Sequence, residues 1–273
     1  LVDQSATVEA GGIVRGDLYF ARVEDDKELE DFTLNLEGGT RIEGSLNLST
    51  GAKDPDLIQT YLKTLTINSN GTEGNLETGD TANIITGDIT AYDDANSADG
   101  NEILEVTINA DQVFNLLGDL KFSSIHNDDE IAKLTINGSA AVNINAVDVR
   151  DTDVDGLNVV NNGTGLVTIG LDAAKITTSQ DALSFTGTGS IALNVRGGLV
   201  LLFDDVLSSV TQITTASSGI LALSADQVVA LGAENLLGNG NLDIIDLGAQ
   251  ALDTTLIADD LDVSVTTAGG TYT

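Results

Sequence analysis

The chain has 273 residues, and its 43 Asp and Glu against 11 Lys and Arg give a formal net charge of −32. Such a surface repels phosphate groups, which excludes nucleic acid as a partner and disfavours an anionic membrane surface. The absence of Cys excludes disulfides and thiolate sites, and the single His126 leaves no ligand set for zinc.

Apolar residues make up 41% of the sequence, enough for a sizeable core, so we expect a folded chain. No run of about 18 apolar residues occurs, and we therefore expect no membrane insertion. The sequence begins at Leu1 without Met and without a signal-peptide pattern, and we interpret it as a processed or excised part of a longer protein.

The first 55 residues differ in composition from the rest of the chain. Five of the 11 basic residues precede Pro55, and a charged segment fills residues 24–30. Residues 32–36 and 45–48 alternate apolar and polar side chains around a Gly-Gly turn, which predicts a pair of short strands. Pro55 is the only proline, and proline disfavours helix at the residue before it. We predict a small N-terminal β subdomain or cap over residues 1–55 and a repeat region over residues 56–273.

A short pattern recurs after Pro55. The stretch Leu134-Thr135-Ile136-Asn137-Gly138 has variants at 65–68, 106–109, 167–170 and 193–197, and looser ones at 221–224 and 262–265. Thr, Val and Ile favour strands, and Asn-Gly ends a strand in a turn. The spacings from Thr66 to Thr107, Thr135 and Thr168 are 41, 28 and 33 residues, within the range of repeat architectures. We expect each variant to be a strand in one turn of a solenoid, here called a rung.

Three other stretches carry structural predictions. The apolar run 199–203 predicts a buried strand, and residues 261–266 predict a final strand whose exposed edge can accept a strand of another subunit. The sequence Ala-Asp-Gln-Val occurs at 110–113 and again at 225–228, each time after a strand-like run. We interpret each copy as one helical turn with Asp near its N-terminus.

Short strands, 29 glycines and internal self-similarity together predict an all-β fold, a parallel β-solenoid (β-helix) of short irregular rungs. Tandem β-sandwiches are the alternative. They would call for more regular hairpins and an aromatic core, and aromatic residues are only 4% of this chain.

Calcium is the cofactor that the sequence favours. Asp151, Asp153 and Asp155 stand at alternate positions before Gly156, as in the first half of a calcium loop, although the twelfth position is Asn162 and not Glu. Other groups of acids are candidates of the same kind: Asp93 and Asp94 with Asp99, Asp128 with Asp129, Asp204 with Asp205, and Asp259 and Asp260 with Asp262. The alternative is a solvated acidic surface that binds no specific ion.

Nothing in the sequence marks an enzyme. His126 lies in a polar, acidic stretch without a nucleophile motif, and we interpret it as solvent-exposed. A carboxylate-based polysaccharide lyase or hydrolase on a β-helix remains a third hypothesis, although only six basic residues follow Pro55 to assist such chemistry.

The Leu-Thr-Ile-Asn variants, the segment 223–231 and the turn Gly238-Asn239-Gly240 resemble β-strand-repeat regions of large secreted bacterial surface proteins, such as calcium-dependent S-layer proteins and type I-secreted adhesins. The resemblance covers residues 60–273. It implies a secreted, non-enzymatic protein at the cell surface that folds on extracellular calcium and assembles into a lattice or filament. The glycine-rich nonapeptide of that family is absent, so its calcium sites are not carried over.

We therefore expect an extracellular structural protein, the subunit of a calcium-stabilised S-layer or surface filament, with its own copies as main partner and cell-surface polysaccharide as a further one. The second hypothesis is the stalk or ligand-binding region of a secreted adhesin.

Overall fold

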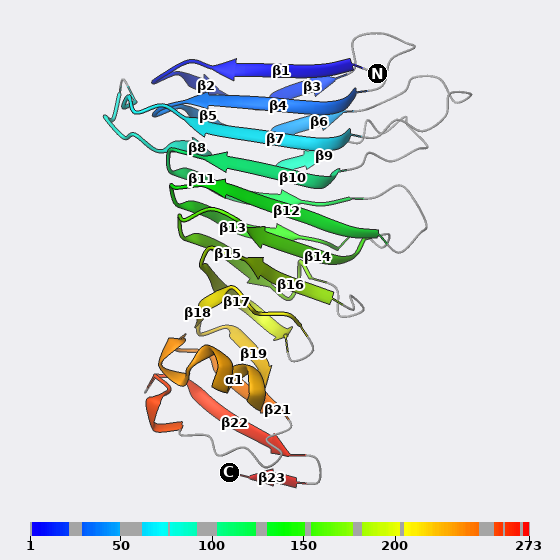
Figure 1. The fold of residues 1–273 in the computed structure, drawn as a ribbon, viewed down its shortest axis with the longest axis vertical. Coiled ribbons are helices and arrows are strands. Elements are labelled where there is room, and N and C mark those ends of the chain that lie inside the picture. Colours follow the sequence, from blue (N-terminus) through cyan, green and yellow to red (C-terminus); the bar gives the residue numbers. More distant parts are fainter. Residues whose placement is uncertain are drawn as a thin grey trace, which may run out of the picture.

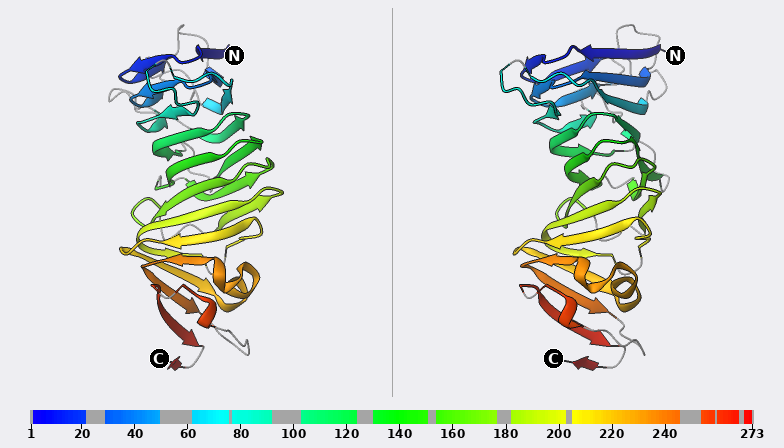
Figure 2. Two further views of the ribbon diagram at one scale, coloured as in Figure 1. Left: turned by 90° about the vertical axis from the view of Figure 1, so that its left-hand side faces the viewer. Right: turned by 60° about the vertical axis from the view of Figure 1, so that its left-hand side comes forward.

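The structure is a computed structural model. It describes residues 2–21, 29–49, 62–75, 77–91, 103–123, 130–150, 154–176, 182–202, 205–245, 254–258, 260–267 and 270–272. In these residues the chain forms a stack of parallel strands that advances along the long axis from the N-terminal to the C-terminal end (Figures 1 and 2). The fold is a parallel β-solenoid, which confirms the predicted fold class.

One side of the stack is a sheet of seven strands, the first sheet. Each strand pairs in parallel with the strand one rung away. The order is β1 (Val2–Val8), β4 (Leu29–Glu37), β7 (Leu62–Asn70), β10 (Ile103–Ala110), β12 (Glu130–Gly138), β14 (Val154–Asn161) and β16 (Ala182–Gly187). These strands run across Figure 1 one below the other.

The remaining 16 strands form a second, bent sheet that provides the other sides of the stack. In its upper part each rung contributes two short strands: β2 (Ile13–Arg15) and β3 (Leu18–Ala21), β5 (Arg41–Glu43) and β6 (Leu46–Ser49), β8 (Asn83–Ile85) and β9 (Ile89–Ala91). Longer strands then serve both sides: β11 (Phe114–Lys121), β13 (Val142–Asp148), β15 (Val167–Asp172) and β17 (Ile191–Leu201). The lower part holds β18 (Val210–Thr215), β19 (Gly219–Ser224), β20 (Leu236–Gly238), β21 (Asn241–Ile245), β22 (Asp262–Thr267) and β23 (Gly270–Tyr272).

Glycines occupy the bend of the second sheet in successive rungs. A Cβ atom on Gly44 would lie 2.4 Å from the backbone carbon of Gly16, one on Gly87 would lie 2.6 Å from the backbone carbon of Gly44, and one on Gly118 would lie 2.2 Å from the carbonyl oxygen of Gly87. Contacts this short leave no room for a side chain. Glycine is therefore required where the bends of adjacent rungs stack on one another.

The core runs through the stack as a continuous column of apolar side chains. Inward positions of the first sheet are occupied by fully buried residues such as Leu34, Ile67, Ile108 and Ile136. Strand alternation explains this arrangement, since the Thr and Asn residues between these positions point to the opposite face. Each rung buries its apolar side chains against the rungs above and below, as expected for a solenoid.

The first sheet ends at β16, which the next rung meets only through an isolated parallel bridge between Ser184 and Val206. The amide of Phe185 in β16 donates to the carbonyl of Val206 at 2.7 Å. The chain then continues from Val206 into β18. One rung later α1 (Ala225–Leu231) follows β19, with Ser224 and Gln227 forming a capping box at its start. The Gln227 side chain also donates to the carbonyls of Leu202 (2.5 Å) and Asp205 (2.9 Å), which fixes α1 against the preceding rung. The 3₁₀ turns η1 (Ala233–Asn235) and η2 (Thr254–Leu256) complete this end.

Strands from both sides of Pro55 pair directly, since β4 pairs with β7, β5 with β8 and β6 with β9. Pro55 itself lies outside the described residues. A cap would also pair its strands with the sheets of the solenoid, so this pairing is compatible with a cap and with an ordinary rung. The division at residue 55 therefore stays a prediction.

Two expected strand arrangements are wrong in detail. Residues 32–36 and 45–48 do lie in strands, β4 and β6, but these pair with neighbouring rungs and not with each other. The apolar run 199–203 is also not uniformly buried: Val200 is buried, whereas Leu199 and Leu201 are 43% and 39% exposed. Both differences arise because neighbouring strands come from different rungs and each strand has an outer face.

The two Ala-Asp-Gln-Val copies differ in structure. Residues 225–228 begin α1, as predicted, but residues 110–113 form only the tight corner between β10 and β11. At that corner the amides of Asp111 and Gln112 both donate to the carbonyl of Ser69. Pairing of the flanking strands with adjacent rungs outweighs the local tendency to form a helical turn.

Candidate functional site

Most acidic groups predicted to bind calcium lie outside the described residues. This applies to Asp151, Asp153, Asp93, Asp94, Asp99, Asp128, Asp129, Asp204 and Asp259. Four candidates are described: Asp155, Asp205, Asp260 and Asp262.

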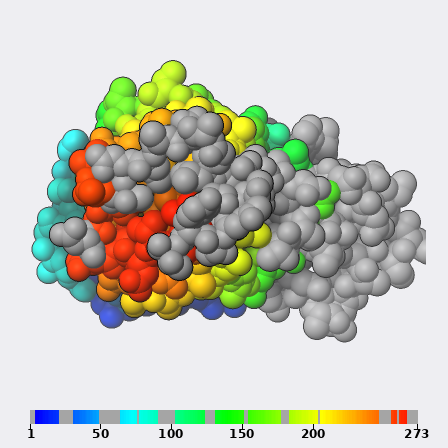
Figure 3. Space-filling view, turned by 90° about the horizontal axis from the view of Figure 1, so that it is seen from below, coloured from blue at the N-terminus to red at the C-terminus, as the bar shows by residue number. Residues whose placement is uncertain are grey.

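The described candidates lie at separate places in the stack. Asp155 is half-buried in β14. Asp205 precedes β18, and its carboxylate accepts the backbone amide of Leu183 at 2.8 Å, so it fixes the end of the first sheet. Asp260 and Asp262 are exposed at the start of β22, at the C-terminal end that Figure 3 views along the long axis. Within the described ranges no group of three or more His, Asp or Glu side chains could hold a metal ion. Calcium binding stays a prediction.

The outer face of the first sheet carries two straight columns of uncharged side chains, all of them polar except Val160. The strand registers place Ser5, Thr33, Thr66, Thr107, Thr135, Val160 and Thr186 in the first column. The second column contains Thr7, Asn35, Asn68, Asn109, Asn137 and Asn162. We call these residues the neutral face.

The asparagines of the second column bond to one another along the stack. The amide of Asn68 donates to Asn35 at 2.8 Å, that of Asn109 donates to Asn68 at 2.8 Å, and that of Asn137 donates to Asn109 at 2.9 Å. Asn35 reaches Thr7 at 3.4 Å, and Asn162 reaches Asn137 at 3.5 Å. This Asn ladder fixes the orientation of every amide in the column.

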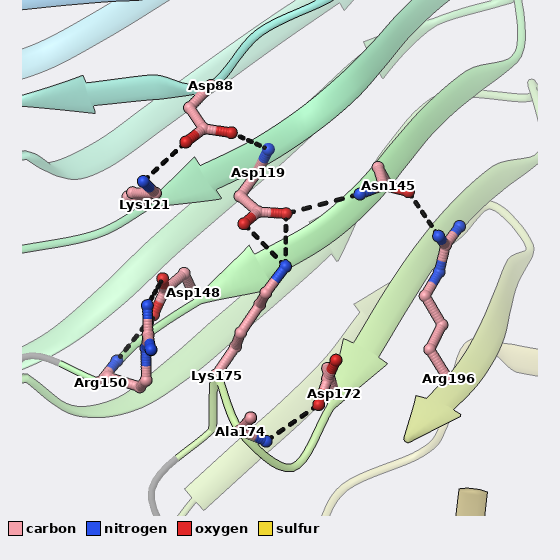
Figure 4. Close-up of polar contacts among 10 residues, drawn as sticks. All are labelled: Asp88, Asp119, Lys121, Asn145, Asp148, Arg150, Asp172, Ala174, Lys175 and Arg196. Atoms are coloured by element: carbon pink, nitrogen blue, oxygen red, sulfur yellow. Dashed lines mark hydrogen bonds and ion pairs between the residues drawn. The ribbon is translucent and has the colours of Figure 1, made fainter. Parts of the chain in front are cut away.

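A second group of polar residues lies on the bent sheet, where charges of both signs meet (Figure 4). Lys121 pairs with Asp88 at 2.6 Å, Lys175 with Asp119 at 2.7 Å, and Arg150 with Asp148 at 2.6 Å. We call these six residues the ionic cluster.

The ionic cluster is joined to the rungs by further hydrogen bonds. The backbone amide of Asp119 donates to the Asp88 carboxylate at 2.8 Å, and the Asn145 amide reaches the Asp119 carboxylate at 3.4 Å. The guanidinium of Arg196 in turn donates to the side-chain oxygen of Asn145. Side chains from β11, β13 and β17 are thereby connected, and the Arg196 side chain reaches past the intervening strand β15.

Protonation in the ionic cluster follows from these contacts. Burial opposes ionisation of Asp88, but the Asp119 amide and the Lys121 ammonium outweigh it and hold the pKa of the carboxyl below its ordinary value. The hydrogen bond and charge of Asp148 raise the pKa of Arg150 above its ordinary value. Both shifts favour the ionised forms of Asp88 and Arg150.

Sequence reasoning did not find the ionic cluster. Its partners are distant in the chain, since 31 residues separate Asp88 from Asp119 and 56 separate Asp119 from Lys175. Rung lengths differ, so these pairings have no fixed spacing that could signal them. The only available signal was the presence of five basic residues in an otherwise acidic region: Lys121, Lys133, Arg150, Lys175 and Arg196.

Comparison with known proteins adds no relative: no family model, curated protein or solved structure matches this chain. Among the described residues no helix is long and apolar enough to cross a membrane.

Proposed function

We propose that this chain is a non-enzymatic extracellular structural protein, a subunit that stacks with other copies into a calcium-stabilised surface layer or filament. The observation that carries the proposal is the incomplete burial of core positions at both ends of the stack. These positions continue the core column, and among the described strands they are covered less completely than the interior positions.

At the N-terminal end, β1 pairs only with β4 among the described strands. Its inward residues Ala6 and Val8 are half-buried, whereas Leu34 and Leu36, which stand beside them one rung below, are fully buried. An unpaired strand edge above partly exposed apolar side chains can accept a further strand, and pairing would bury those side chains.

At the C-terminal end, Val263 of β22 is 37% exposed, although Leu242, its partner in β21, is fully buried. The strand β23 pairs with β22 only over Val265–Thr267, so it leaves the first half of β22 without a partner on that side in the described chain. The predicted final strand is thus followed by a short antiparallel one, which covers its edge in part.

Charge supports the role proposed for calcium. No Lys or Arg follows Arg196, while ten carboxylates do, so copies that stack end to end bring concentrated negative charge together. Like charges oppose association unless cations compensate them. Divalent ions held by the acidic segments are the simplest compensation, and the same ions would favour an extracellular setting.

The ionic cluster supports the non-enzymatic part of the proposal. Lys121, Lys175 and Arg150 each pair with a carboxylate, and the pairs of Lys121 and Lys175 connect different rungs. A second candidate function is the stalk or ligand-binding region of an adhesin. The neutral face favours it, because two adjacent columns of uncharged side chains on the outside of a sheet are suited to binding an uncharged ligand.

Electron microscopy of the full chain in matched samples, one with millimolar calcium and one with a chelator, tests the proposal. We expect ordered sheets or filaments only with calcium. Compact monomers in both samples at high protein concentration would contradict it.

A further inference from the structure

The neutral face has an unusual composition for this chain. Charged residues make up 20% of the sequence, yet none occurs in either column. Charges begin in the flanking positions, at Asp31, Glu105 and Lys133 on one side and at Glu37 on the other. An outer sheet surface of a chain with a net charge of −32 is expected to carry carboxylates, so their absence from two adjacent columns points to an uncharged ligand.

The neutral face is also regular in two dimensions. Registers from β4 through β7 and β10 to β12 continue without a shift, so the columns are straight over these strands. Adjacent strands lie about 4.8 Å apart, and alternate residues along a strand lie roughly 6.7 Å apart. Hydroxyl groups and amides therefore form a regular lattice with these two repeats. A ligand that fits such a lattice must itself repeat in two directions.

The polar groups of the lattice are held in place before any ligand arrives. Thr is stiff at its first side-chain torsion, and the Asn amides are fixed by the ladder. Across the described chain no other residue hydrogen-bonds to the hydroxyls of Thr33, Thr66, Thr107 and Thr135, which are half-buried. A preordered array loses little side-chain entropy on binding, which favours a rigid ligand.

We propose that the neutral face binds ice through ordered water. Ice is uncharged, and its planes present rows of water oxygens that repeat in two directions at distances comparable to those of the Thr and Asn columns. Water accepts and donates hydrogen bonds equally, which matches Thr hydroxyls and Asn amides. The Thr methyl groups offer an apolar patch beside each hydroxyl, where water can order without competing protein hydrogen bonds.

Two other occupants fit less well. A second copy would bring another net charge of −32 against this sheet, and the repulsion opposes face-to-face contact. A crystalline neutral polysaccharide shares the repeating and uncharged character of ice, but sugar rings are held largely by aromatic stacking, and neither column contains an aromatic residue.

The test is thermal hysteresis and inhibition of ice recrystallisation by the full chain in calcium-containing buffer. Variant Thr107→Lys places a long charged side chain at the centre of the first column, and Thr66→Lys does so one rung away. Thr168→Lys is the matched control, because Thr168 is also a half-buried, outward residue in a parallel strand but belongs to the bent sheet. Circular dichroism and thermal unfolding establish that each variant is folded.

We expect the wild-type chain and Thr168→Lys to show both activities and either neutral-face variant to lose most of them. A folded wild-type chain without ice activity would overturn the proposal. Equal losses of ice activity in all three variants would also overturn it. The same holds if Thr107→Lys and Thr66→Lys both keep full ice activity. Co-sedimentation with crystalline cellulose or chitin that is lost in Thr107→Lys, with no ice activity in the wild type, would assign the face to a polysaccharide instead. The proposed assembly in calcium uses the ends of the stack and not the neutral face. Electron microscopy of assembly therefore tests the structural role independently of ice binding.

Discussion

The side-chain amide of Asn109 donates at 2.8 Å to the side-chain oxygen of Asn68, which stands 41 positions earlier in the sequence. The loop between the two strands can vary in length because only the register of adjacent rungs determines the contact. Recurrence of the pattern Leu-Thr-Ile-Asn at irregular intervals thus reflects a regular structure.

This relationship predicts that an interior member of the Asn ladder contributes more to stability than an isolated pair does. Asn109→Ala removes one donated and one accepted hydrogen bond, and we expect the free energy of unfolding to fall by roughly 1–2 kcal/mol. Asn143→Ala is the control, because Asn143 donates to Asn115 at 2.7 Å on an exposed surface. Urea unfolding measures both, and an equal or larger loss in Asn143→Ala would contradict the prediction.

Asp88 predicts a pH dependence of stability. Its pKa is below the ordinary value in the folded chain, so the ionised carboxylate stabilises the fold above the unfolded pKa of about 3.9 and this contribution is lost as pH falls through the folded pKa. We expect Asp88→Asn to be less stable than the wild type at neutral pH, and the difference to shrink in acid. Denaturant unfolding over a pH series measures it. Lys121→Gln should remove much of the same dependence, and a difference that is constant with pH would refute the interpretation.

Gly170 predicts a steric effect next to the ionic cluster. A Cβ atom there would lie 1.7 Å from the carbonyl oxygen of Asn145 and 2.8 Å from Nε of Arg196. Gly170→Ala must displace the backbone of the neighbouring rung, and we expect a loss of about 1–3 kcal/mol in unfolding free energy. Gly197→Ala is the control, because its nearest atom would be 3.7 Å away. Thermal unfolding that affects both variants equally would show that this packing does not matter.

Calcium is predicted to stabilise the fold as well as its assembly. An ion that binds only the folded chain adds about 2.7 kcal/mol when its concentration is 100 times the dissociation constant. We therefore expect a chelator to lower the unfolding temperature, and the double variant Asp151→Asn with Asp153→Asn to reduce the number of ions bound in calorimetric titration. Unfolding that is identical with and without calcium would exclude a structural ion.

The repeat pattern predicted individual strands better than it predicted their neighbours. Residues 65–68, 106–109 and 134–138 do stack on one another in the first sheet, so the spacing from Thr66 to Thr107 and Thr135 follows the rungs. Thr168 does not continue that column. Its strand β15 pairs with β13, and Thr135 stands beside Val160. Apolar and polar residues alternate in the same way in the strands of both sheets. The sequence pattern therefore does not distinguish one side of the solenoid from another.

The site was less predictable than the fold for the same reason. Acidic segments stand out in the sequence because neighbouring residues share a charge. The neutral face and the ionic cluster are formed by residues from different rungs, such as Asp119 and Lys175, and only the strand registers bring them together. The apolar and polar alternation predicts which residues point outward but not which of them become neighbours.

The most direct test of the structural role is electron microscopy of wild type, Val8→Lys and Ile131→Lys side by side in millimolar calcium. Val8 faces inward at the open N-terminal end, and a lysine there can extend its amine into solvent while blocking the next rung. Ile131 is an exposed apolar residue of β12 in the middle of the stack, away from either end. The proposal predicts ordered assemblies for the wild type and Ile131→Lys, and monomers for a folded Val8→Lys. Assemblies of unchanged form in Val8→Lys, or none in the wild type, would contradict it.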